Sequence, residues 1–443
     1  MTNKGSVMSK IDIIKKHGLK GSPAMGLAMA TFGFFIGFAA VSLYGPVAAK
    51  LKDILGISGF LLGLLVAAPN LSGSLLRIPF SAWVDKVGGK KPILILFLLS
   101  LIGMVGLTTL LILYYPSHFS RDSYWLIVLF GILSGSGIAI FSPGIAQTSY
   151  WYPNNKQGFA LGAYAGFGNL APGLIGIFLP IALHGLGLTD TYLLWLGFLL
   201  AGTVLYWIFA HDSYYFQLVK QGIGKHEAIE IAKQLDEEHF PTVSTLESLK
   251  ISAMVPSTWA LVALYFTSFG GFLALTVWFP TYWAKSYHFD LREAGLLMAV
   301  GFSLLSSLIR VWGGSISDKF GGEAIAILSY FVVLVGASII FFAHDVFWIA
   351  VTGEVVIGAG MGIANAAVFK LVPKYVPNAT GGAAGWVGGL GAFGGFVVPP
   401  ILGIFIDRYG VAGYEKGFSV YMVLAVISII ISFVLLVTHR HDV

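Results

Sequence analysis

The sequence contains no cysteine among its 443 residues, and only 11% of its residues carry a charged side chain. The absence of cysteine excludes disulfide bonds, thiol catalysis and metal or cluster sites that depend on thiolates. No other feature predicts a metal site or a cofactor. The formal net charge of +5 is spread over short loops, so it does not indicate a nucleic-acid partner. What the chain has in abundance is apolar residues, since 57% are hydrophobic and the mean hydropathy is +0.84.

This composition predicts an all-α membrane protein that crosses the lipid bilayer many times, because no soluble domain of this size could bury so much apolar surface. The longest polar interval, 211–253, divides the chain into two halves of six predicted helices each. The predicted regions are a cytoplasmic tail over 1–21, an N-terminal half over 22–210, a cytoplasmic linker over 211–253, a C-terminal half over 254–438 and a cytoplasmic C-terminus over 439–443. Twelve apolar segments are long enough to span as helices: 22–49, 54–84, 92–115, 124–149, 157–183, 188–210, 254–284, 294–317, 324–343, 346–370, 378–406 and 417–438.

The distribution of lysine and arginine predicts that both termini are cytoplasmic. With the N-terminus inside, the inside segments carry 17 Lys and Arg residues and the outside loops carry seven. The first twenty residues contain five lysines but no short apolar core with a cleavage site, so they read as a tail rather than a signal peptide. We therefore expect a multi-pass protein of the cell (inner) membrane.

An internal repeat relates the two halves. In each half a lone arginine ends an apolar run eight residues before an Asp-Lys-x-Gly-Gly turn, and the two copies are 233 residues apart. Two related halves joined by a cytoplasmic loop resemble the plan of the major facilitator fold, whose substrate site lies near the midplane between the halves. The paired positions are Arg77 with Arg310, Asp85 with Asp318, Lys86 with Lys319, Phe35 with Phe269, Gly166 with Gly389 and Gly168 with Gly391.

The two arginines are predicted to bind an anionic substrate. Eight helical residues rise about 12 Å, which puts each arginine near the middle of a hydrocarbon core roughly 30 Å thick. A central arginine normally faces a cavity or a counter-ion, yet only Glu354 lies well inside a predicted span. Two arginines against one acid leave positive charge, and the guanidinium fork suits a planar oxyanion. The alternative is a structural ion pair inside the membrane.

Glu354 has two readings that the sequence leaves open. It could carry a coupled proton, or it could pair with a polar neighbour or with one arginine. None of the ten histidines lies well inside a predicted span, so a histidine proton relay and an intramembrane catalytic histidine are not expected. We expect no enzyme activity, because no nucleophile and base are paired within the spans.

The Asp-Lys-x-Gly-Gly turns resemble the signature between helices two and three of the major facilitator superfamily, and we interpret them as gating elements rather than substrate ligands. Glycines at close spacing let helix backbones approach and slide. We assign gating to the turns and to two glycine strings, with the residues Asp85, Lys86, Asp318, Lys319, Gly166, Gly168, Gly389 and Gly391.

A narrower resemblance follows from the glycine strings. Residues 150–169 read YWYPNNKQGFALGAYAGFGN, and residues 385–396 read GWVGGLGAFGGF. Together with the paired arginines, these stretches resemble the two signatures of the nitrate/nitrite porter family. The resemblance implies nitrate or nitrite held between Arg77 and Arg310 and surrounded by aromatic rings. It assigns substrate contacts to Phe141, Tyr265, Phe269 and Asn169, less securely to Phe35 and Phe369, and puts Ser306 where the family often has asparagine.

The expected mechanism is alternating access, in which the anion offsets the repulsion between the arginines and lets the halves close. This favours nitrate/nitrite exchange. We expect the protein to be a monomer. Proton-coupled nitrate symport is the close rival, because Glu354 could carry the proton. The alternative substrate is another small oxyanion, such as a carboxylate or phosphate. A sensor derived from a transporter is a further alternative, although the linker of about 43 residues contains no recognisable domain.

Overall fold

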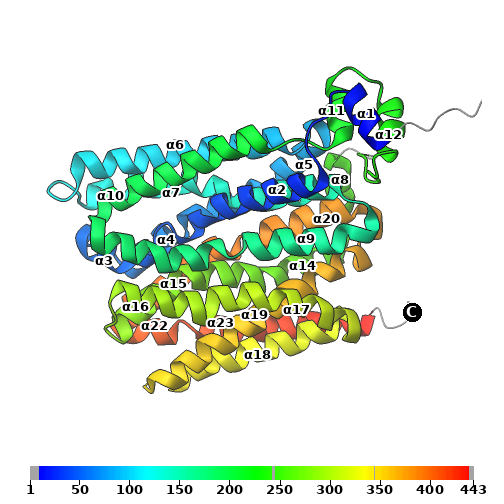
Figure 1. Cartoon of the computed structure of the whole chain (residues 1–443). Helices are drawn as coiled ribbons and strands as arrows, with labels where there is room; N and C mark the ends of the chain where they lie inside the picture. Colours follow the sequence, from blue (N-terminus) through cyan, green and yellow to red (C-terminus); the bar gives the residue numbers. More distant parts are fainter. Residues whose placement is uncertain (1–8, 242–244, 344, 439–443) are drawn as a thin grey trace, which may run out of the picture.

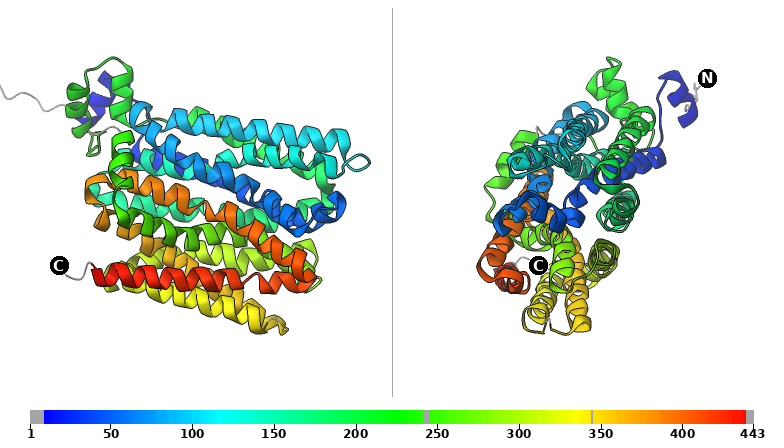
Figure 2. Two further views of the ribbon diagram at one scale, coloured as in Figure 1. Left: turned by 180° about the vertical axis from the view of Figure 1, so that it is seen from behind. Right: turned by 90° about the vertical axis from the view of Figure 1, so that its left-hand side faces the viewer.

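The structure is a computed structural model, and it describes residues 9–241, 245–343 and 345–438. The predicted C-terminal segment 439–443 lies outside the described residues. All regular elements in the described ranges are helices, in agreement with the predicted fold class. The N-terminal half fills the upper part of Figure 1 and the C-terminal half the lower part, with the helices of both halves roughly along one direction. The first and last described helices end at the same end of the bundle, here called the terminal end (Figure 2).

The N-terminal half consists of long apolar helices interrupted by short tight turns. Ser58 caps one of them by accepting a hydrogen bond from the backbone N–H of Leu61, which satisfies a free helix donor. The elements are α2 (Pro23–Phe38), η1 (Ala39–Ser42), η2 (Gly45–Val47), α3 (Ala48–Leu55), α4 (Gly59–Leu75), α5 (Arg77–Val87), α6 (Lys90–Tyr114), η3 (Arg121–Ser123), α7 (Tyr124–Ser134), η4 (Gly135–Ile140), α8 (Phe141–Trp151), α9 (Asn154–Gly168) and α10 (Ala171–Phe209).

The C-terminal half repeats this plan, but three of its helices contain π-helical turns, namely η5, η6 and η8. Such turns insert an extra residue and are frequent at functional sites. The elements are α14 (Pro256–Tyr265), η5 (Phe266–Gly270), α15 (Gly271–Ser286), α16 (Leu291–Leu297), η6 (Met298–Leu304), α17 (Leu305–Phe320), α18 (Gly322–Ala343), α19 (Phe347–Tyr375), η7 (Pro377–Ala379), α20 (Thr380–Trp386), η8 (Val387–Gly391), α21 (Gly394–Tyr409), η9 (Gly410–Ala412), α22 (Gly413–Lys416) and α23 (Ser419–Thr438).

Eleven helical stretches in the described ranges are long and apolar enough to cross a membrane, whereas the sequence predicts twelve. The difference lies in the stretch Asn155–Phe209, whose 55 residues exceed what one crossing needs. Gly187 interrupts it with φ 78° and ψ −179°, a conformation that glycine adopts without strain. The stretch therefore holds the fifth and sixth predicted segments, 157–183 and 188–210.

The linker is more ordered than its length and composition indicate. It forms α11 (Tyr214–Lys220), α12 (Lys225–Lys233) and α13 (Thr245–Ala253), and the N-terminal tail forms α1 (Lys10–Lys16). Figure 1 shows α1, α11 and α12 grouped beyond the ends of the membrane helices. These four helices were not foreseen, because helices this short are stable only when tertiary packing buries one face. The buried core of the group comprises Ile13, Leu19, Trp151, Tyr214, Tyr215, Phe216, Leu218, Ala228, Ala232 and Leu235.

The two halves pack tightly at the end opposite the termini. A Cβ at Gly63 of α4 would lie 2.2 Å from the carbonyl oxygen of Pro399 in α21, so only glycine permits this approach. Asp407 of α21 also accepts a hydrogen bond from the backbone N–H of Phe60 at 2.8 Å. Lys285 and Asp53 form an ion pair across the halves at 3.1 Å. This end of the interface is therefore closed.

Candidate functional site

Arg77 lies between the two halves at the start of α5 and is fully buried. Its Nε donates to the carbonyl oxygen of Gly73 at 3.0 Å, and its Nη1 donates to the carbonyl oxygen of Gly388 in the other half at 3.0 Å. Its Nη2 is buried and has no partner among the described residues. A buried guanidinium with an unused donor is costly in the absence of a ligand, so this nitrogen marks a place for an acceptor.

Arg310 on α17 approaches the same region from the C-terminal half. Its Nη2 lies 3.5 Å from the hydroxyl oxygen of Tyr265, and its Nη1 is buried without a partner in the described ranges. Neither Arg310 nor Arg77 forms an ion pair with an acid there. The alternative, a structural ion pair between an arginine and an acid inside the membrane, therefore does not form among the described residues.

Two phenyl rings join the arginines into one site. The guanidinium carbon of Arg77 lies 4.8 Å from the ring centroid of Phe141 and 5.1 Å from that of Phe269. The guanidinium carbon of Arg310 lies 6.0 Å and 5.8 Å from the same two centroids. The two rings are stacked with centroids 5.9 Å apart. Ring faces stabilise both cations, yet the like charges still repel each other, and an anion between them would remove that repulsion.

The predicted aromatic residues mostly surround these rings. Tyr265 stacks on Phe269 at 5.0 Å, and Phe369 lies edge-on to Tyr265 at 4.8 Å. Phe35 is half-buried, and the ring contacts from its helix come instead from Phe34, which lies 5.2 Å from Phe141, and from Phe38, which lies 6.3 Å from Phe269. Sequence reasoning missed Phe34 and Phe38.

A physical reason for the difference at Phe35 lies in the helix geometry. Phe269 is its repeat mate, but Phe269 sits in the π-helical turn η5, whereas Phe35 lies in the regular helix α2. One extra residue in a turn rotates the following side chains by about 100° around the axis. The repeat relates the positions in sequence and does not fix which of them face the site.

Asn169 and Ser306 differ in what they could offer an anion. Asn169 is buried at the junction of α9 and α10, next to Ser307, which donates to its carbonyl oxygen at 3.0 Å. Its side-chain Oδ1 has no partner among the described residues. The hydroxyl of Ser306 donates to the carbonyl oxygen of Gly358 at 2.7 Å, so its proton is already used. The hydroxyl proton of Ser306 is thus not available to an anion, whereas each arginine keeps a nitrogen without a partner among the described residues.

The two glycine strings lie against the helices that carry the arginines. Gly389 of η8 approaches Ile78 of α5, where a Cβ would lie 2.6 Å from Cγ1 of that isoleucine. Gly166 of α9 faces Val311 of α17 more loosely, with a Cβ 3.6 Å away. Gly391 fits against Tyr265, whose Cβ would lie 2.8 Å from an added Cβ. One glycine of each string therefore borders the helix that carries the arginine of the opposite half.

Gly168 is expected to tolerate no larger residue. A Cβ there would lie 1.9 Å from Cδ1 of Phe34, whose buried ring stacks on Tyr164 at 5.3 Å and has no room to move. We expect Gly168→Ala to destabilise the protein by about 1–3 kcal/mol, the usual cost of overpacking. Gly162→Ala in the same helix is the control, because nothing lies within 4 Å of a Cβ there. Thermal unfolding in detergent measures both, and equal melting temperatures would contradict this packing.

The acids of the two Asp-Lys-x-Gly-Gly turns contact neighbouring helices of their own halves. Asp85 accepts a hydrogen bond from the hydroxyl of Tyr150 on α8 at 2.6 Å. Asp318 forms an ion pair with Lys370 on α19 at 2.6 Å. Lys86 lines a groove beside α13, and Lys319 lies over the ring of Phe320. The contacts of Asp85 and Asp318 therefore join helix ends within each half.

Two cavities lead from the terminal end towards the arginines. One, of about 690 Å³, runs between α9 and α17 and is lined by Arg310, Gly166 and Asp318. The other, of about 400 Å³, lies between α8, α20 and the linker and is lined by Asp85, Tyr150 and Phe240. Phe141 and Phe369 line both. With the opposite end closed, the site is reached from the side of the termini.

Glu354 on α19 lies apart from the arginines. It is fully buried, its Oε2 accepts a hydrogen bond from Nε1 of Trp283 at 3.1 Å, and its Oε1 has no partner among the described residues. A Cβ added at Gly301 of η6 would lie 3.1 Å from its Oε2, and Gly301 belongs to the same membrane-spanning stretch as Arg310. Within the described ranges Glu354 therefore pairs with a polar neighbour, Trp283, and not with an arginine.

Comparison with known proteins places this arrangement in a family. The profile of the Major Facilitator Superfamily matches residues 30–399 and again 284–442. The chain belongs to the Major Facilitator Superfamily. Its fold is also that of the xylose transporter XylE of E. coli, solved in a partially occluded inward open conformation, with a TM-score of 0.70, 15% identity and coverage of 93% of this chain and 97% of that one. The superfamily assignment agrees with the predicted fold and with a transporter rather than an enzyme.

Curated relatives are more specific in their names. The chain is 29% identical over 422 residues to the "Probable nitrate/nitrite antiporter NarK1" of Thermus thermophilus, covering 91% of this chain and 89% of that protein. It is 28% identical to the "Probable nitrate/nitrite transporter NarK2" of Mycobacterium tuberculosis, with 87% and 89% covered. It is 26% identical to the "Nitrite extrusion protein" of Bacillus subtilis, with 91% and 92% covered. The resemblance to nitrate/nitrite porters thus extends along nearly the whole transporter.

Proposed function

We propose that this chain transports nitrate and nitrite across the membrane by alternating access, with the anion held between Arg77 and Arg310. The observation that carries the proposal is the pair of buried, unpartnered guanidinium nitrogens, Nη2 of Arg77 and Nη1 of Arg310. Both belong to cations that share the rings of Phe141 and Phe269. The names of the relatives support nitrate and nitrite as the substrates.

The chemistry of the site favours a small planar anion. Directed N–H donors bind the oxygen atoms of an oxyanion in its plane, whereas the apolar ring faces suit an anion that gives up its hydration shell readily. A divalent or bulkier anion would need more donors than the arginines supply, because the hydroxyl of Ser306 is engaged. Phosphate therefore fits the site less well than a monovalent anion does.

The same charges favour exchange of one anion for another. Without an anion, closing the halves brings two like charges together in a site of low dielectric. The loaded transporter has no such barrier, so it should change conformation faster than the empty one. In this mechanism the tight interface around Gly63 and Asp407 opens while the cavities at the terminal end close.

Proton-coupled nitrate symport is the second candidate, and Glu354 is the observation that favours it. A fully buried carboxyl group with a free oxygen is a group that a proton could occupy. Gly301, which lies against Glu354, belongs to the same membrane-spanning stretch as Arg310, Leu291–Phe320, so protonation of Glu354 could influence the position of the arginine.

A binding titration tests the substrate class. We expect the purified protein to bind nitrate and nitrite at least about tenfold more tightly than chloride, which has no coplanar oxygens for the two guanidinium forks. We expect the same difference from formate, which fits a fork but is more strongly hydrated and so loses more on entering between the rings of Phe141 and Phe269. Isothermal titration with the four sodium salts at constant ionic strength measures this order. Formate binding as tight as nitrate binding would instead identify a small carboxylate as the substrate class.

A further inference from the structure

A cavity outside the transport path lies at the terminal end of the N-terminal half. It has a volume of about 260 Å³ and shares no residue with the two cavities that lead to the arginines. Three elements build it: the first turns of α6, the last turn of α10 and the adjoining start of the linker. Its lining consists of Lys90, Lys91, Leu94, Ile95, Trp207, Asp212 and Lys220.

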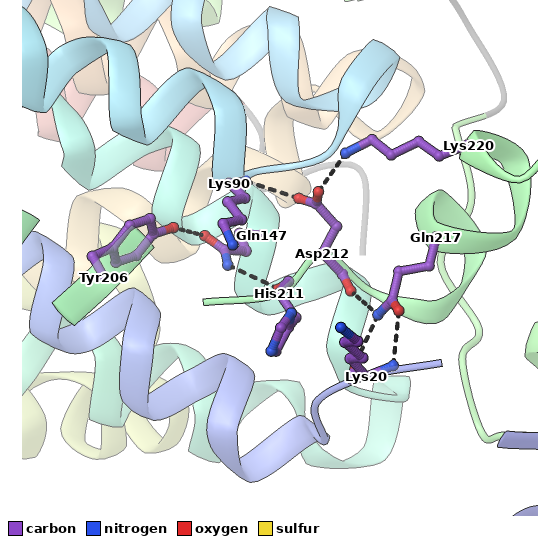
Figure 3. Close-up of polar contacts among 8 residues, drawn as sticks. All are labelled: Lys20, Lys90, Gln147, Tyr206, His211, Asp212, Gln217 and Lys220. Carbon is purple, nitrogen blue, oxygen red and sulfur yellow. Dashed lines mark hydrogen bonds and ion pairs between the residues drawn. The ribbon is translucent and has the colours of Figure 1, made fainter. Parts of the chain in front are cut away.

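The cavity carries more positive than negative charge. Its only acid, Asp212, is nearly buried and already has two partners (Figure 3). One oxygen accepts from the backbone N–H of Lys90 at 2.8 Å, and the other pairs with the ammonium group of Lys220 at 2.6 Å. The ammonium groups of Lys90 and Lys91 form no ion pair with an acid in the described ranges.

The pKa of the neighbouring His211 is affected by the same excess of positive charge. Its pKa is lowered first by burial and then by the cationic side chains of Lys90 and Lys20, against which Asp212 acts in the other direction. Figure 3 shows Lys20, Lys90 and Lys220 arranged around the segment of His211 and Asp212. The three lysines belong to the N-terminal tail, α6 and α11, so the fold itself brings the cations together.

The remaining walls of the cavity are apolar and face the membrane. Leu94, Ile95 and Trp207 line it, and Trp207 is 61% exposed. Large exposed side chains continue from there along the same helices, among them Leu98 of α6 and Ile208 of α10. Tryptophan is enriched at the level of lipid headgroups, where one part of the ring meets hydrocarbon. The cavity therefore has a cationic mouth and a wall continuous with the lipid-facing surface.

We propose that this cavity binds an anionic phospholipid, with the phosphate between Lys90, Lys91 and Lys220 and an acyl chain along Trp207. Basic pockets between membrane helices on the cytoplasmic side bind such headgroups, and the predicted orientation places this end in the cytoplasm. A free phosphate ion would use the lysines but not the apolar wall. Because Lys220 belongs to α11, the lipid would also fasten the linker to the membrane surface.

Native mass spectrometry of the whole protein, titrated with dioleoyl phosphatidylglycerol or phosphatidylcholine, tests this proposal. We expect phosphatidylglycerol to bind preferentially, and Lys90→Gln with Lys91→Gln to weaken it about 30-fold, or about fivefold for each lysine near an anionic headgroup. The double variant leaves Asp212 in place, because the aspartate holds the backbone of Lys90 rather than its ammonium group. Replacing both lysines with arginine should restore binding.

Lys16→Gln with Lys225→Gln is the matched control, since it removes two exposed lysines from the same helical group outside the cavity. Equal lipid binding by the control and by the Lys90→Gln/Lys91→Gln variant would overturn the proposal, as would equal affinity for the two lipids. Displacement of phosphatidylglycerol by millimolar inorganic phosphate would also overturn it, because that result identifies a site for a soluble anion. Nitrate transport is not measured, so the outcome is independent of the proposed function.

Discussion

Replacing either arginine with lysine is expected to weaken nitrate binding by about 10- to 100-fold. Lysine keeps the charge but loses the planar fork, and a hydrogen bond to a charged group contributes about 1.5–3 kcal/mol. In Arg77→Lys and Arg310→Lys the ammonium group would also have to lie against the rings of Phe141 and Phe269 without the delocalised contact of a guanidinium. Isothermal titration with nitrate and uptake into proteoliposomes measure the two consequences.

The two variants should differ in stability. Arg77 donates to the carbonyl oxygens of Gly73 and Gly388, whereas the single hydrogen bond of Arg310 reaches the hydroxyl of Tyr265 at 3.5 Å. Arg77→Lys removes a contact between the halves and should lower the melting temperature, while Arg310→Lys should leave it nearly unchanged. Arg292→Lys, an exposed arginine on α16, is the control for both measurements. Nitrate affinity at the level of the wild type in both variants would reject the arginine pair as the binding site.

The pairing of the arginines was predictable from the sequence because it depends on topology. A repeat at constant offset places Arg77 and Arg310 at equivalent depths in two related halves, and such halves face each other across the substrate site. The scarcity of acids within the spans then indicated an anion. The positions of Phe141, Tyr265 and Phe269 followed only from the resemblance, since an aromatic residue in a membrane helix more often faces lipid or packs against another helix.

Contacts that depend on local helix geometry were not predictable. Gly388, whose carbonyl oxygen accepts a hydrogen bond from Arg77, lies in the π-helical turn η8, where the regular helical backbone pattern is interrupted. Nothing in the sequence distinguishes Gly388 from the glycines beside it. The contacts of Phe34 and Phe38 with the site were not predictable for the same reason. They depend on which face α2 turns towards the rings of Phe141 and Phe269.

The helices of the linker were missed for an energetic reason. α11 and α12 have seven and nine residues, too few to be stable alone, and they form where Tyr214, Phe216 and Leu218 are buried against the tail and the end of α8. The carboxylate of Glu237 stabilises this arrangement by accepting hydrogen bonds from the backbone N–H groups of Tyr214 and Tyr215 at 2.6 and 3.0 Å. Such long-range contacts leave no periodic signal in a polar segment.

Nitrate uptake into proteoliposomes is expected to depend on internal nitrite or nitrate and to ignore a pH gradient. If the empty transporter must close with its two guanidinium groups roughly 8 Å apart at an effective dielectric constant of about 20, their repulsion is about 2 kcal/mol. That energy slows the empty transporter about 30-fold relative to the loaded one. Exchange should therefore exceed net uptake by at least about tenfold when internal anion is varied at constant membrane potential.

Glu354→Gln separates this mechanism from proton-coupled symport. Glutamine keeps the volume of the side chain and can still accept the hydrogen bond from Nε1 of Trp283, but it cannot gain or lose a proton. Under exchange, the variant should transport at nearly the rate of the wild type at every pH. Under symport, an inward proton gradient should drive nitrate into vesicles that contain no internal anion, and Glu354→Gln should abolish that uptake. The repulsion between Arg77 and Arg310 is present whether Glu354 is protonated or not. Normal exchange by Glu354→Gln would therefore show that the arginines alone couple the movement of one anion to that of the other.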